Sequence, residues 1–146
     1  MGNIRRRGRE AALQLLFASD IENQLAEGQN RDTFWELCTT KPEGRKFAEE
    51  LVDGVLLHLP QIDQAVARCL ENFEMSRLSA VDRNLLRLAS YELLFAPDVP
   101  APVVINEAIE IAKAFGTPDS GRFVNGVLDQ VRKNGLPPEP AEQPDR

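Results

Sequence analysis

One stretch of the chain, residues 78–95 (LSAVDRNLLRLASYELLF), constrains the fold more than any other. At 100° per residue, its apolar side chains cover about half of a helix circumference. Ser79 can cap the first turn of this helix, and Asp82 can reach back to the cap. So wide an apolar arc predicts a helix that packs against several neighbours at once, at the centre of a helical bundle.

The polar residues of this central helix divide into two groups. Glu92 lies in the middle of the apolar arc, where an unpaired carboxylate would cost several kcal/mol. We interpret it as a structural group that hydrogen-bonds a neighbouring helix, and a catalytic acid is the less favoured alternative. Arg83, Asn84, Arg87 and Tyr91 lie on the opposite face, which the periodicity predicts to be the outer face of the helix.

Helical spacing of apolar residues recurs along most of the chain, and no segment alternates as a strand would. Besides the central helix, helices are expected at residues 3–25, 33–38, 45–59, 62–73, 102–115 and 118–132. Pro60 separates the first three from the rest. The chain is therefore predicted to be all-α, with about seven helices in one domain of residues 1–132 and subdomains at about 1–60 and 61–132. Residues 133–146 contain four prolines, which predicts a disordered tail.

Three local features carry expectations of their own. Gly54, inside a predicted helix, predicts the close approach of another helix. Gly8 is expected to let the first helical turns fray. Thr117 is a candidate N-cap of the last helix, with Pro118 in its first turn.

Four arginines, Arg5, Arg6, Arg7 and Arg9, lie within five residues near the N-terminus. The formal net charge is −6, and without these four the remaining thirteen basic residues against twenty-three acidic ones give −10. An acidic body with one cationic end predicts a polyanionic partner there, a nucleic acid or a membrane surface. Guanidinium groups form bidentate hydrogen bonds with phosphates and stack on bases, which suits single-stranded RNA. A basic end without a dedicated partner is the alternative. Arg5 and Arg9 are expected in solvent, past the end of the core.

Several classes of function lack the residues that they require. The chain has one histidine, and its two cysteines, Cys38 and Cys69, show no metal-ligand spacing, so no metal or cofactor is predicted. No phosphate-binding loop or nucleophile–base spacing occurs, and Glu107 and Glu110 fall on the exposed face of their helix. No apolar run approaches the roughly 18–20 residues of a membrane span, and the cysteines suit a reduced, cytoplasmic setting. These residues indicate a helical binding protein, not an enzyme.

Four blocks of the sequence resemble the NusB family of transcription antitermination factors, in the order and spacing of that family. The blocks are RRRGREAALQLLFASD, VDRNLLRLASYELLF, INEAIEIAKAFG and RFVNGVLDQV, which begin at residues 5, 81, 105 and 122. The resemblance implies an all-helical fold of two packed bundles. It also implies a bacterial RNA-binding factor that binds the boxA element of nascent ribosomal RNA transcripts together with the ribosomal protein NusE. With NusA and NusG on RNA polymerase, such a factor prevents premature termination.

The resemblance also implies where the partners bind. It implies that the arginine cluster binds RNA, and that Lys113, Asp119 and Arg122, in the segment that joins the last two helices, bind RNA as well. Asp119 has a structural alternative, because a carboxylate in the first turn of a helix complements the helix dipole. Polar residues of the central helix are candidates for the protein partner or the edge of the RNA site: Asp82, Arg83 and Arg87.

Three other functions stay open. The same helical fold resembles the RNA-recognition domain of certain ribosomal RNA cytosine methyltransferases, although no catalytic domain follows in this chain. The turn FGTP at residues 115–118 could belong to a DNA-binding helix-turn-helix, but the next helix has few residues suited to reading bases. An oligomerising scaffold without nucleic acid is the third, since some proteins of this family form homodimers.

Overall fold

The computed structural model describes residues 2–21, 31–38, 40–70 and 74–136, and within them the chain forms helices and no strand. The helices are α1 (Gly2–Ile21), α2 (Arg31–Leu37), α3 (Pro42–Leu57), α4 (Leu59–Ala67), α5 (Ala80–Phe95), α6 (Ala101–Phe115) and α7 (Ser120–Asn134), with a short 3₁₀ turn, η1, at Met75–Arg77. The prediction of an all-α fold is confirmed.

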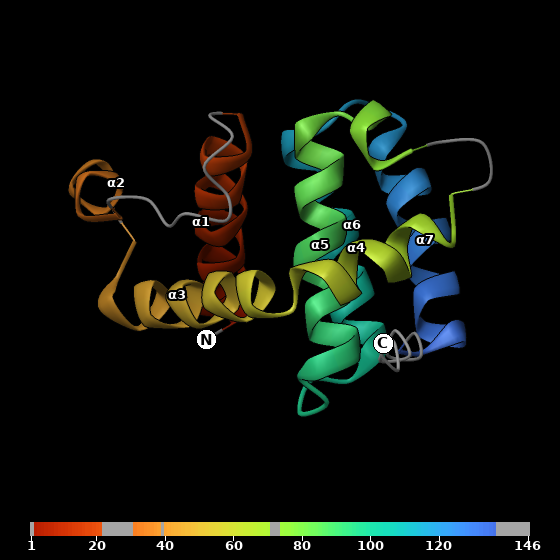
Figure 1. Cartoon of the computed structure of the whole chain (residues 1–146). Helices are drawn as coiled ribbons and strands as arrows, with labels where there is room; N and C mark the ends of the chain where they lie inside the picture. Colours follow the sequence, from red (N-terminus) through yellow and green to blue (C-terminus); the bar gives the residue numbers. More distant parts are fainter. Residues whose placement is uncertain (1, 22–30, 39, 71–73, 137–146) are drawn as a thin grey trace, which may run out of the picture.

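The helices form two groups that share one core (Figure 1). Helices α1, α2 and α3 make up the first group, in which α3 crosses the N-terminal half of α1. Helices α4 to α7 make up the second group. Buried apolar residues of both groups belong to a single cluster, so the two groups are parts of one packed unit.

Helix α5 is the central helix that its wide apolar arc predicts. It packs against α1, α3, α4, α6 and α7, and Leu85, Leu86 and Leu88 are at most 1% exposed. Its N-terminus is capped by Ser79, whose Oγ accepts from the Asp82 backbone N–H at 3.1 Å. The reciprocal half of the cap is not formed, because the buried Oδ1 of Asp82 accepts no hydrogen bond from any described residue.

The break at Pro60 is confirmed. His58 ends α3 and also precedes the first residue of α4, with Pro60 in the first turn of α4. His58 stacks on Phe95 with ring centroids 3.9 Å apart, so it contributes to packing. Helix α4 ends at Ala67, earlier than its apolar stripe predicts, and Phe73 at the end of that stripe lies outside the described residues.

The expected start of the last helix is wrong. Helix α7 begins at Ser120, because the Thr117 backbone N–H donates to the Ser120 Oγ at 3.0 Å and the chain is still turning at Thr117. Asp119 occupies the N-cap position, without a side-chain capping bond. Helix α7 also runs to Asn134, two residues further than predicted, and residues 137–146 of the predicted tail lie outside the described part.

Two glycines allow helices to approach closely. At Gly54 of α3 a Cβ atom would overlap the ring of Tyr91 of α5, which confirms the close approach predicted there. At Gly8 of α1 a Cβ atom would lie 2.8 Å from Phe47 Cδ2 and 3.0 Å from the carbonyl oxygen of Gly44, both in α3. The expectation that Gly8 loosens the arginine turns is wrong, because α1 is helical from Gly2 onward and Gly8 lies at the crossing with α3.

Candidate nucleic-acid interface

The arginine cluster lies within the regular helix α1, so its members point in different directions. Successive residues of an α-helix are turned by about 100° around its axis. The exposed fraction of the side chain is 74% for Arg7, 35% for Arg6 and 5% for Arg9, and Arg5 is exposed as well. The four guanidinium groups therefore have different surroundings and do not form one basic patch.

Arg9 is a core residue. Its Nε and Nη2 donate to the two carboxylate oxygens of Glu92 in α5, each at 2.8 Å, and the Glu92 side chain is 2% exposed. The expectation that Arg9 projects into solvent is wrong, because α1 packs on α5 at this level. The interpretation of Glu92 as a structural carboxylate that ties two helices together is confirmed. The pair satisfies two charges that would otherwise be buried alone.

Arg6 joins α1 to α6. Its Nε and Nη2 donate to Glu107 Oε1 and Oε2 at 2.5 and 2.8 Å. This hydrogen bonding raises the pKa of Arg6 and lowers the pKa of the Glu107 carboxyl. The Glu107 side chain is 18% exposed, so its expected place on a solvated face is wrong. Glu110, one turn further along α6, pairs with Lys113 at 3.3 Å.

Arg5 and Arg7 keep guanidinium groups that are free to meet a ligand. Arg5 Cζ lies 4.8 Å from the centroid of the Phe47 ring, a cation–π contact that leaves the donor groups at the edge of the guanidinium unused. Arg7 has an ion pair with Glu10 at 3.8 Å, too long for a strong hydrogen bond. Of the four arginines, these two are best suited to bind an anion from solution.

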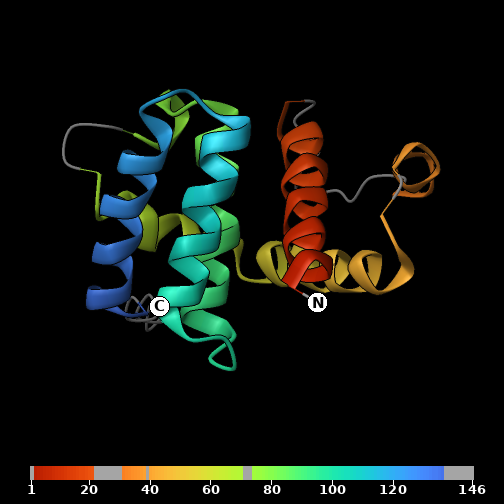
Figure 2. The same cartoon turned by 180° about the vertical axis from the view of Figure 1, so that it is seen from behind.

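The segment that joins α6 and α7 supplies a second exposed charged group. Lys113, Asp119 and Arg122 are all exposed. Figure 2 shows α1, α6 and α7 side by side on one face, with the start of α1 at the lower end and the α6–α7 turn at the upper end. The structure thus places the two predicted basic regions on one face, but at opposite ends of it.

The predicted outer face of α5 is covered by other helices. Asn84 is fully buried and Arg87 is 7% exposed, so this part of the prediction is wrong. Arg87 donates to both carboxylate oxygens of Asp63 in α4, at 2.8 and 3.1 Å. Arg83 donates to Asp20 of α1 at 2.8 Å. These residues join three helices, and the face is buried because α1 and α4 pack on it.

The carboxylate at the centre of this network, that of Asp20, is held in its charged form. Burial alone would raise the pKa of Asp20, but hydrogen bonds from Asn84 and Arg83 act against it, and the net result is a lowered pKa. Asp82 lies at the start of α5 and is half-buried. The assignment of Asp82, Arg83 and Arg87 to a protein partner stays a prediction, and Arg87 is the least accessible of the three.

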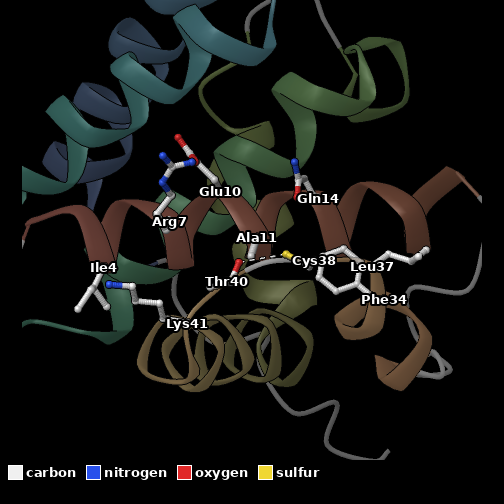
Figure 3. A pocket seen from close by; sticks show the side chains of 11 residues that line it. Ile4, Arg7, Glu10, Ala11, Gln14, Phe34, Leu37, Cys38, Thr40 and Lys41 are labelled. Carbon is white, nitrogen blue, oxygen red and sulfur yellow. Dashed lines mark hydrogen bonds and ion pairs between the residues drawn. The ribbon is translucent and has the colours of Figure 1, made fainter.

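A groove beside Arg7 is a feature that the sequence pattern does not reveal (Figure 3). One wall is a stripe of α1 that includes Ile4, Arg7 and Gln14, whose spacing along the helix is visible in the sequence. The other wall includes Phe34 and Lys41, which come from α2 and from the residue before α3. No local pattern in the sequence indicates that this second wall faces α1.

Metal-binding clusters and membrane-spanning helices are absent from the described residues. No group of three or more histidine, cysteine or acidic side chains in the described ranges could hold a metal ion. No helix among the same residues is long and apolar enough to cross a membrane.

Known proteins match the chain over most of its length. The model of the NusB family matches residues 6–133. The transcription antitermination protein NusB of Sorangium cellulosum (strain So ce56) is 45% identical over 127 residues, which cover 87% of this chain and 90% of the relative. The protein of the same name from Trichlorobacter lovleyi is 47% identical over 131 residues, covering 88% of this chain and 89% of the relative.

Solved structures are similar as well. The NusB protein of T. maritima is 41% identical and superposes with a TM-score of 0.79, covering 91% of this chain and 93% of that one. A chain in the crystal structure of the antitermination factors NusB and NusE in complex with dsRNA is 27% identical, with a TM-score of 0.77 and coverage of 92% and 99%. The family model spans residues 6–133, and relatives with 45% and 41% identity are matched over about nine-tenths of this chain, so the chain belongs to the NusB family.

Proposed function

We propose that this protein is an RNA-binding transcription antitermination factor that acts in the cytoplasm and catalyses no reaction. Its RNA is the boxA element of nascent ribosomal RNA transcripts, which it binds together with the ribosomal protein NusE. With NusA, NusG and RNA polymerase, the complex prevents premature termination. Membership of the NusB family and the antitermination names of the relatives support this role.

The observation that carries the proposal is the pair of exposed guanidinium groups on α1. Arg5 and Arg7 have no hydrogen-bonded carboxylate partner among the described residues, although the chain as a whole is acidic. A phosphate oxygen supplies the partner that they lack. We assign the direct RNA contacts to Arg5 and Arg7, a partial contact to Arg6, and a structural role to Arg9.

The α6–α7 segment extends the proposed RNA face. Lys113 and Arg122 supply two further exposed cations, and Asp119 lies between them. Near the RNA backbone, the carboxylate of Asp119 repels phosphate and limits the affinity. The start of α5, at Asp82 and Arg83, is the part of the central helix that we assign to the protein partner.

The test is a titration of fluorescently labelled single-stranded boxA RNA, with and without NusE, at two salt concentrations. We expect NusE to tighten binding. Each phosphate contact contributes about −0.7 to the slope of log affinity against log salt, so Arg5 and Arg7 together contribute about −1.4. Duplex RNA belongs in the test because the solved NusB–NusE complex holds dsRNA. Duplex DNA of the same sequence is the control.

Two results would contradict the proposal. One is the absence of RNA binding in both the presence and the absence of NusE. The other is equal affinity for duplex DNA, which would favour a general polyanion-binding or DNA-binding protein. The methyltransferase alternative is disfavoured because the relatives at 45% and 47% identity are transcription antitermination proteins.

A further inference from the structure

Helices α1 and α2 and the start of α3 enclose a groove of about 870 Å³. This volume lies within the roughly 300–1,000 Å³ of sites that hold small organic ligands. Figure 3 shows Ile4, Arg7 and Lys41 towards one end and Phe34 and Leu37 towards the other.

The first end of the groove is cationic. Arg7 and Lys41 are exposed, and they come from different elements, α1 and the residue before α3. The guanidinium group of Arg7 has only the 3.8 Å contact with Glu10, and Lys41 has no ion pair within the described part of the chain. Both side chains lie at this end of the groove, and exposed cations there suit a phosphate group.

The second end of the groove is aromatic and apolar. Phe34 is partly buried against the core, and Leu37 is 83% exposed. Figure 3 shows Gln14 and Thr40 between the two ends. The Gln14 amide can donate and accept hydrogen bonds, and the Thr40 hydroxyl lies 3.0 Å from Cys38 Sγ. An aromatic ring with polar groups beside it is the combination on which proteins stack and recognise unpaired bases.

Ion pairs and hydrogen bonds hold both walls in place. Arg31 of α2 pairs with Glu49 and Asp53 of α3, the latter at 2.8 Å. The Trp35 Nε1 of α2 donates to Glu49 Oε2 at 2.6 Å, and the Phe34 and Trp35 rings meet edge-on with centroids 4.9 Å apart. The α1 wall is fixed by the buried pair that Arg9 forms with α5. The groove is therefore preformed, which reduces the entropy lost when a ligand binds.

We propose that this groove binds one unstacked nucleotide of a single-stranded RNA, with its phosphate at Arg7 and Lys41 and its base against Phe34. The inference rests on the proposed function and adds a site to it, because Arg7 belongs both to the exposed arginines of α1 and to the groove. An RNA strand bound to Arg5 and Arg7 would therefore reach the opening of the groove. The base must be unpaired, since a base inside a duplex is stacked on its neighbours.

The two free cysteines allow a direct test. Cys38 lies in the groove, whereas Cys69 follows α4, and burial raises the pKa of the Cys69 thiol, which slows its alkylation. The alkylation rate of each thiol with RNA is therefore compared with the rate of the same thiol in the free protein. Single-stranded boxA RNA at about ten times its Kd, without NusE, should slow Cys38 alkylation by about tenfold and leave the Cys69 rate unchanged. Duplex RNA at equal occupancy should leave Cys38 reactive.

Charge variants provide the second arm. Lys41→Ala removes an exposed cation of the groove, and Lys46→Ala removes an exposed cation of α3 that does not line it. We expect Lys41→Ala to weaken RNA binding and to make the salt slope shallower by about 0.7, with Lys46→Ala unchanged. Phe34→Leu keeps an apolar side chain but removes the ring, and should weaken binding by about tenfold. Circular dichroism checks that each variant keeps its helices.

The outcomes separate the two proposals. If anisotropy shows that RNA binds while Cys38 reacts at its free rate, the groove assignment is overturned and the proposed function stands. Equal effects of Lys41→Ala and Lys46→Ala, equal protection of Cys38 by duplex RNA, or a Cys38 thiol that is unreactive in the free protein would also overturn the groove assignment. If no RNA binds, both proposals fail.

Discussion

At the scale of single residues, the arginine cluster is a set of side chains with different roles. Arg9 is buried with Glu92, Arg6 is paired with Glu107, and Arg7 is 74% exposed. Neighbouring positions on a helix point in different directions, so a run of like charges in the sequence does not become a patch. Burial, and not charge alone, separates the arginines that hold the fold from those that can meet a ligand.

The pair formed by Arg9 and Glu92 leads to a stability prediction. Arg9→Met leaves Glu92 buried without a partner and should lower the free energy of unfolding by about 3–5 kcal/mol. The double variant Arg9→Met, Glu92→Leu removes both charges and should recover most of this loss. Urea denaturation measures both values. Arg7→Met is the matched control, expected within about 0.5 kcal/mol of the wild type because the side chain is mostly exposed.

If the double variant lost as much stability as the single variant, the loss would come from the packing of the Arg9 side chain and not from an unpaired charge on Glu92.

Glu92 also shows what the sequence can and cannot reveal about one residue. A carboxylate in the middle of an apolar arc had to have a partner, and this requirement is visible from the helix alone. The identity of the partner is not visible, because Arg9 lies 83 positions away and the angle of Glu92 on its own helix says nothing about which helix faces it. For the same reason, the sequence alone places Arg9 in solvent, and only the packing of α1 against α5 shows that it is buried.

At the scale of helices, positions are predicted better than faces. The starts and ends of most helices follow from local signals, such as the Ser79 cap and the Pro60 break. The faces depend on what packs against each helix. The polar side of α5 resembles a solvent face, yet α1 and α4 cover it, and the charges of Arg83 and Arg87 are satisfied by Asp20 and Asp63.

Alanine substitutions at two helical glycines are predicted to change the free energy of unfolding in opposite directions. Gly126 lies inside α7, and a Cβ atom added there would have no atom within 4 Å, so Gly126→Ala should raise the free energy of unfolding by about 0.5–1 kcal/mol through helix propensity. Gly54→Ala should lower it, because the new methyl group displaces the Tyr91 ring, which stacks near His58 and Phe95. Thermal denaturation compares the two variants. Stabilisation by both would show that Tyr91 moves aside at little cost.

The contact between α1 and α6 should make stability depend on acidity. The pKa of Glu107 is lowered below its ordinary value of 4.5, first through the hydrogen bond from Arg6. A carboxyl group with a lowered pKa in the folded state stabilises the fold above its unfolded pKa, and this contribution is lost as the pH falls through the folded value. Stability should therefore decrease as the pH falls below about 4.5.

The variant Glu107→Gln isolates this contribution. It cannot titrate, so it should be less stable than the wild type at pH 7 and lose less stability on acidification. Urea denaturation at several pH values measures both effects. Parallel curves for the two proteins would mean that other carboxylates, such as the Asp20 group with its lowered pKa, account for the whole acid response.

At the scale of the whole molecule, the charged residues that join helices lie in the interior, and other cations lie at the surface. The interior ion pairs join α1 to α5 and α6, and α5 to α4. The exposed cations remain on a protein whose formal net charge is −6, so they are local sites for a polyanion on an otherwise repulsive body. This arrangement is consistent with the RNA-binding face that we propose on α1.

RNA binding by the exposed arginines of α1 is the proposal on which the assigned function depends. Its most direct test is the salt dependence of boxA RNA affinity, measured by fluorescence anisotropy for the double variant Arg5→Ala, Arg7→Ala. The matched control is Arg132→Ala, Lys133→Ala, which removes the same charge from exposed positions at the end of α7. We predict weaker binding and a slope shallower by about 1.4 for the α1 variant, with wild-type behaviour for the control. Equal affinity and slope in the two variants would contradict the claim.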